Sequence, residues 1–152
     1  MDERESPTVP SVVSLVLCDQ VIDDRLSDKK SAIGIFNTVL VPQFPAVINQ
    51  MAILASVTEI SGRADVELRL VRDSDNAVLF SGHGPVEAPN PLAVVDLLFA
   101  IHGVRIPEPG QYAYEIVCQQ AILARRRFQV LSRPPARPEI KPPPPPGPYS
   151  IG

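Results

Sequence analysis

An alternation of side-chain character over residues 112–130 constrains the fold more than any other feature. Apolar or aromatic residues occupy every second position over residues 112–118, and a similar alternation follows over 124–130. Successive side chains of a β-strand point to opposite faces, so this period of two indicates strands and not a helix. The pattern predicts a β-hairpin that turns at Gln119-Gln120, follows a tight turn at Pro109-Gly110, and buries one face in a core.

Strand signals continue upstream, and turn signals separate them. Residues 11–20 form a continuous apolar, β-branched run, which predicts a strand buried on both faces. Residues 64–71 alternate apolar with charged side chains, so we expect a strand with one face exposed. The other expected strands are 31–41, 49–60 and 78–82, and the expected turns are 23–30, 42–45, 61–62 and 73–77.

Residues 90–103 fit two structures. Asn90, Pro91 and Gly103 are suitable as the cap, the first residue and the end of a helix. The valines, phenylalanine and isoleucine between them favour extended structure. We prefer a strand and keep the helix as the alternative for residues 91–102.

The strand pattern predicts an all-β fold, either a β-sandwich or a β-barrel, since short strands recur with turns between them. Of the two we expect a single antiparallel β-sandwich. The expected organisation is a flexible segment at 1–10, a sandwich domain at 11–131 and a proline-rich tail at 132–152. Of 18 prolines in 152 residues, nine lie between Pro134 and Pro148. We expect this tail to be disordered or extended.

Charge and hydropathy narrow the classes of partner. The net charge is −3 and no basic stripe is present, which argues against binding to nucleic acid. No apolar run is long enough to cross a bilayer, and the first ten residues lack the apolar stretch of a signal peptide. We therefore expect a cytoplasmic protein in which Cys18 and Cys118 are buried thiols and not a disulfide.

Three short motifs resemble a known family. They are the Cys18-Asp19 pair after the first strand, Gly34-x-Phe36 with the following Phe44-Pro45, and the Gly110-x-Tyr112 corner. Over residues 11–131 the sequence resembles a bacterial family of small proteins described only as a domain of unknown function. The resemblance implies an immunoglobulin-like or related antiparallel sandwich and implies no activity.

The residue types that perform catalysis or bind metals form no recognisable motif. His83 and His102 have no ligand spacing around them, and no nucleophile elbow, phosphate loop or dinucleotide fingerprint occurs. We expect a protein that is not an enzyme and has no catalytic residue, cofactor or metal site. A calcium-binding or small-ligand sandwich is the alternative, because two expected loops collect aspartates: Asp19, Asp23, Asp24 and Asp28 in one, and Asp73 and Asp75 in the other.

Two features are candidates for protein binding. Alternation places Arg125 and Arg127 on one face of their strand, where they either cover a sheet edge or dock an acidic partner. Arg126 lies on the other face, the side of Phe128. In the tail, Pro142 to Pro146 predict a polyproline rod that carries Tyr149 and Ile151 beyond it. We expect a non-catalytic interaction or structural module within a larger assembly, which binds a protein partner or a second copy through this tail.

Overall fold

The computed structural model describes residues 9–134 and 141–148, and within these residues the regular structure is entirely β. The chain forms β-strands because turn residues repeatedly interrupt short β-branched and aromatic runs. The ten strands are β1 (Ser11–Cys18), β2 (Gln20–Asp24), β3 (Lys29–Ile33), β4 (Thr38–Val41), β5 (Ala46–Thr58), β6 (Arg63–Arg72), β7 (Val78–Glu87), β8 (Val95–Ile106), β9 (Gly110–Cys118) and β10 (Ala121–Ser132).

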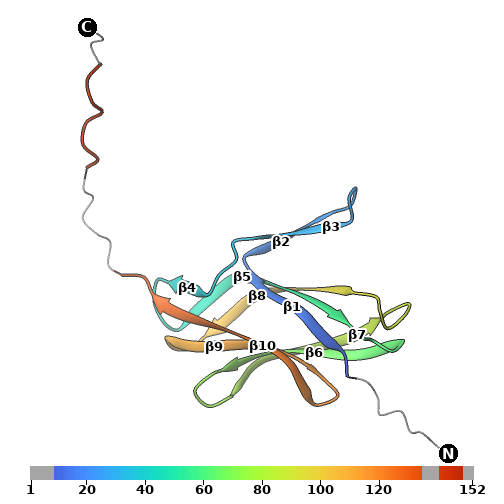
Figure 1. The fold of residues 1–152 in the computed structure, drawn as a ribbon. Coiled ribbons are helices and arrows are strands. Elements are labelled where there is room, and N and C mark those ends of the chain that lie inside the picture. Colours follow the sequence, from blue (N-terminus) through green and yellow to red (C-terminus); the bar gives the residue numbers. More distant parts are fainter. Residues whose placement is uncertain (1–8, 135–140, 149–152) are drawn as a thin grey trace, which may run out of the picture.

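The strands form two larger sheets and one hairpin (Figure 1). One sheet has three strands in the order β1-β5-β8, and the other has five in the order β4-β10-β9-β6-β7. All pairs in these sheets are antiparallel except β4 with β10, which is parallel. The hairpin β2–β3 projects from the three-stranded sheet on the side away from the five-stranded one.

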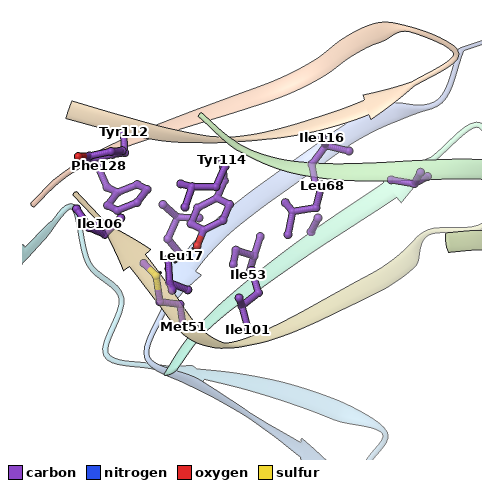
Figure 2. Close-up of a cluster of buried hydrophobic side chains, with 14 of the residues drawn as sticks. Leu17, Met51, Ile53, Leu68, Ile101, Ile106, Tyr112, Tyr114, Ile116 and Phe128 are labelled. Carbon is purple, nitrogen blue, oxygen red and sulfur yellow. Dashed lines mark hydrogen bonds between the residues drawn. The ribbon is translucent and has the colours of Figure 1, made fainter. Parts of the chain in front are cut away.

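The two larger sheets share one hydrophobic core (Figure 2). Tyr112, Tyr114 and Ile116 of β9 alternate toward it and are fully buried, as the period of two predicts. The aromatic ring of Phe128 stacks on Tyr114 at a centroid separation of 5.4 Å and also contacts Tyr112 at 6.0 Å. Aliphatic side chains of the opposite sheet, including Leu17 and Ile53, complete this core.

The hairpin from β9 to β10 confirms the strongest sequence prediction. Gln119 and Gln120 form its turn with φ angles of 50° and 65°, the left-handed region that tight hairpin turns use and that glutamine adopts less readily than glycine or asparagine. At the start of β9, the Tyr112 hydroxyl donates a hydrogen bond of 2.6 Å to the Glu108 carbonyl oxygen. This bond closes the corner at Pro109-Gly110, where Gly110 has a φ of 148°.

Residues 90–103 contribute a strand, which confirms the preferred interpretation. The helix signals have other roles: the Asn90 side chain accepts a hydrogen bond from the Leu92 amide in a turn, and β8 starts at Val95. Gly103 lies inside β8 with a φ of 68°, so it does not end a helix. At Gly103 the alternation along β8 shifts by one residue, so that Ile101 and then Val104 face the core.

Two strand predictions were wrong in detail. The run 11–20 is not one strand buried on both faces, because β1 ends at Cys18 and lies at a sheet edge where Val13 is 59% exposed. The segment 31–41 divides into β3 and β4. Hydrogen bonds between the two segments interrupt both predicted strands. The Asp19 amide donates to the carbonyl oxygens of Ile33 and Gly34, and the Phe36 amide donates to the carbonyl oxygen of Leu17.

Candidate interaction surfaces

The outer face of the five-stranded sheet carries Arg125 and Arg127 of the arginine triplet within a network of charges. Arg125 donates hydrogen bonds to Asp73 at 2.6 Å and to Glu115 at 3.0 Å, and Arg127 donates to Asp73 at 3.1 Å. Alternation along β10 places Arg125 and Arg127 on this face, and the strand register sets Arg125 opposite Glu115. The predicted common face of Arg125 and Arg127 is therefore confirmed.

Burial distinguishes the two arginines. The side chain of Arg125 is 24% exposed and that of its partner Glu115 only 5%, whereas Arg127 is 65% exposed. A buried carboxylate needs a cation beside it, because an unpaired charge in a low-dielectric setting is costly. Arg125 therefore has a structural role within the chain. Whether Arg127 docks a partner stays a prediction, and Asp73 already accepts its hydrogen bond.

The charges continue across the same face with alternating sign. Arg69 donates to both carboxylate oxygens of Glu67, at 2.8 and 3.1 Å, and the Ser81 hydroxyl donates to Glu67 at 2.8 Å. The Arg69 hydrogen bonds hold the pKa of the Glu67 carboxyl below its ordinary value. Arg127 and then Arg125 do the same for the pKa of Asp73. Internal pairing thus neutralises much of this face.

Arg126 points the other way, toward the rim of the core. Its Nη2 donates to the side-chain oxygen of Asn37 at 3.1 Å. The position of Arg126 allowed either a place at the rim of the core or a carboxylate partner. The structure shows the rim, where the acceptor is an amide oxygen. Arg126 therefore connects the middle of β10 to the segment before β4.

The aspartates of the two loops do not converge on a common site. Asp24 accepts hydrogen bonds from Leu26 and Ser27 in the β2–β3 turn, and Asp75 pairs with Arg72 at 3.0 Å. The β2–β3 tip and the β6–β7 turn lie at opposite sides of the molecule (Figure 1). Residues 9–134 and 141–148 contain no group of three side chains arranged to hold a metal ion.

The two histidines lie on different strands. His83 is in β7, where its Nδ1 lies 3.4 Å from an Asp65 carboxylate oxygen, and both side chains are exposed. His102 is exposed in β8. Both histidines lie within strands that extend beyond their clearly apolar residues.

The side of the molecule between β7 and β8 is open. These two strands are the edges of different sheets, and in the described part of the chain no strand pairs with the free edge of β8. Three clefts follow one another along this side. They have volumes of about 210, 200 and 440 Å³ and lie beside Asp96 to Phe99, Ile101 to Arg105, and Arg105 to Pro107, respectively.

Most strand edges of this fold are protected against pairing, but the first half of β8 is not. β4 has only four residues, β1 has a register shift between Val12 and Ser14, and β7 contains Pro85, which has no backbone N–H to donate. β8 has 12 residues, and its first half from Val95 to Ile101 contains neither proline nor glycine. An edge of this kind is a template for another strand.

One row of side chains on the outer face beside this edge is apolar, next to the polar row of Ser14, Ser56 and Asp96. Cα register aligns Val16 with Leu54 and Leu54 with Leu98, so these three side chains form one row across the three-stranded sheet. Leu98 is 39% exposed at the open end of the row. The apolar residues on both faces of 95–101 could have indicated an edge that needs a partner, but the sequence does not show which strands lie at the edges.

The described part of the tail, residues 141–148, is exposed along its whole length and has no regular secondary structure. It includes the five consecutive prolines. The candidate partner-binding residues Tyr149 and Ile151 lie outside the described residues, so their predicted contact stays a prediction. Residues 9–134 and 141–148 contain no helix that could cross a membrane.

One family profile matches most of the chain, over residues 13–131. It is described as a family of unknown function (DUF6941). The chain belongs to this family. No curated protein matches the chain significantly.

The residues that match DUF6941 correspond to the folded β-structure. The match covers nearly all of the two larger sheets, including the open side of β8 and the arginine triplet, and it ends before the proline-rich tail. Within the matched residues, Cys18-Asp19 and Gly34-x-Phe36 meet where the β2–β3 hairpin leaves the sheet. Gly34 has a φ of 71°, and a Cβ atom there would overlap the Asp19 carboxylate unless that side chain moved, so glycine is favoured.

Proposed function

We propose that this protein is a non-catalytic protein-interaction module, and that the open side between β7 and β8 receives a strand from its partner. The observation that carries the proposal is the unprotected edge of β8 above apolar clefts. Adding a strand to such an edge supplies main-chain hydrogen bonds, while the clefts accept alternate side chains. On the outer face of the five-stranded sheet, most charged side chains are already paired with one another. That face is therefore the weaker candidate for a binding surface.

An immunoglobulin-like topology accounts for the open edge. If β1, β5 and β8 correspond to strands A, B and E, and β6, β9 and β10 to C, F and G, the order of both sheets agrees with that fold. The hydrogen bond from Tyr112 to the Glu108 carbonyl supports the assignment, since it matches the tyrosine corner at the start of strand F. In that fold strand D pairs with strand E, and no described strand occupies the D position.

The tail belongs to the same proposal as a second contact. Five consecutive prolines are restricted before binding, so docking the proline segment itself costs less conformational entropy. Tyr149 and Ile151 are an aromatic and an aliphatic anchor of the type that dominates binding energy in a groove. We place the protein in the cytoplasm of a bacterium, as a component of a larger assembly. Two free, buried cysteines fit a reducing compartment.

The test is affinity capture with the immobilised full-length protein from an extract of its native cells, followed by quantitative mass spectrometry. Leu98→Lys places a charge in the β8 edge, and Val13→Lys is the matched control because Val13 is 59% exposed on β1. A third protein carries Tyr149→Ala and Ile151→Ala together. Endogenous copies of this chain are counted separately from other proteins.

The expected result is that proteins captured by the wild type and by Val13→Lys are lost with Leu98→Lys. The double tail variant should weaken the same capture. Partners that all three variants retain at wild-type levels would contradict the proposal and place the interface elsewhere. Thermal unfolding of each variant establishes that the differences do not come from loss of the fold.

A further inference from the structure

We infer that the strand received by β8 is β8 of a second copy of this chain, paired antiparallel about a two-fold axis at Leu98. This inference rests on the proposed function, because it names the partner for the same open edge. The three-stranded sheets of two copies would join into one six-stranded sheet. Such an interface is isologous, since each copy contributes the same surface.

The residues that face the core define the register. Side chains of β8 point to the core at Val95, Leu97, Phe99 and Ile101, and after Gly103 the core-facing positions become Val104 and Ile106. Regular alternation therefore covers 95–101 and is interrupted beyond it. In antiparallel pairing, residues opposite each other lie on the same face of the sheet. A two-fold that uses the whole regular run must pass through its midpoint, Leu98.

This register matches apolar residues on both faces. On the outer face Leu98 meets Leu98 of the second copy, so the row of Val16, Leu54 and Leu98 continues directly into its symmetry mate. On the inner face Leu97 lies opposite Phe99, and Val95 lies opposite Ile101. Cross-strand aliphatic and aromatic pairs of this kind stabilise a sheet. Val95, Leu97 and Phe99 are each only partly buried in the single chain, so pairing covers apolar surface.

Charge does not oppose the pairing. Asp96 is the one ionisable residue between Val95 and Ile101, and it already accepts a hydrogen bond of 2.7 Å from the Ser56 hydroxyl of the neighbouring strand. The two-fold sets Asp96 opposite Ala100, so no like charges meet across the junction. Like charges directly opposite each other would be destabilising.

The neighbouring strand β7 leaves room for an incoming strand. Gly84 lines the cleft of about 210 Å³ beside Asp96 to Phe99, and a Cβ atom at Gly84 would meet nothing within 4 Å. Val66 and Val86 provide an apolar floor in the same cleft. The inner side chains of a second β8 would point toward this floor. Since β8 is already formed in the single chain, pairing orders little additional backbone.

The experiment is sedimentation equilibrium of the full-length protein over a wide concentration range. The wild type and Val13→Lys should form dimers, whereas Leu98→Lys alone and Leu98→Glu alone should be monomers, because the two-fold sets like charges against each other. An equal mixture of Leu98→Lys and Leu98→Glu should recover dimers, since residue 98 of each copy then meets the opposite charge. Recovery by mixing requires position 98 to face itself, which loss of folding could not imitate.

A wild type that stays monomeric at every concentration would overturn the inference. So would dimers that persist in Leu98→Lys, or single variants that remain monomeric when mixed although each is folded. If the wild type is monomeric and Leu98→Lys still loses captured partners, the self-pairing is wrong and the proposed strand-binding function stands. If neither dimerisation nor capture depends on residue 98, both are wrong.

Discussion

Tyr112 and Tyr114 are neighbours on the core face of β9, but their hydroxyl groups have different partners. Tyr112 donates to the Glu108 carbonyl at 2.6 Å, whereas the Tyr114 hydroxyl lies 3.3 Å from the Met51 sulfur, a weak acceptor. We expect Tyr112→Phe to lower the free energy of unfolding by about 1 kcal/mol, since it leaves a strong acceptor without its donor. Tyr114→Phe should cost less. Urea unfolding of both variants measures the difference, and equal losses would contradict this role for the corner.

The pairing of Arg125 with Glu115 predicts a second difference. Arg125→Met should lower the free energy of unfolding by about 1–3 kcal/mol, because it leaves the buried Glu115 carboxylate without its cation. Arg127→Met should change it by less than about 0.5 kcal/mol, since that side chain is mostly exposed. Urea unfolding at neutral pH compares them. A larger loss for Arg127→Met would show that the ion pair to Asp73 has been undervalued.

Stability should depend on acid through the charged outer face. Arginine hydrogen bonds hold the pKa values of Asp73, Asp75 and Glu67 below their ordinary values in the folded chain. Their contribution is fully present above the unfolded pKa values of about 4 and is lost as pH falls through the lower folded values. The free energy of unfolding should therefore decline below about pH 4.

The substitution Asp73→Asn tests how much Asp73 contributes to this pH dependence of stability. The variant should be less stable at neutral pH, and its further decline below about pH 4 should be shallower, because one titrating group is gone. Asp23→Asn on the exposed β2 strand is the control. Urea unfolding along a pH series gives both slopes. An unchanged slope for Asp73→Asn would remove Asp73 from the account.

The thiols give a chemical prediction. Cys18 and Cys118 are both free and buried, and burial raises the pKa of each thiol. We expect both to resist alkylation at neutral pH in the folded protein and to react together in denaturant, because thiolate is the reactive form. Mass measurement without reductant counts the labels. A denatured protein that takes up no label would indicate a disulfide.

Local sequence patterns predicted those parts of the fold that depend on local residues. The alternation through Tyr112, Tyr114 and Ile116 and the turn at 73–77 predicted strands and connections correctly, since side-chain period and turn chemistry are local. The division of 31–41 was missed because it depends on bonds from Asp19 and Phe36 to distant carbonyls. The open edge of β8 was missed for the same reason: edge position is set by strand order, and Leu98 looks like a core residue until that order is known.

The most direct measurement of the central claim is hydrogen exchange along β8 at low and high protein concentration. Alternate residues of an antiparallel edge strand direct their N–H groups away from the sheet, so those of 95–101 are exposed in a single chain. If a second β8 pairs there, these amides should exchange more slowly as the concentration rises, while amides of the β7 edge keep their rates. Exchange in 95–101 that is independent of concentration would contradict the pairing.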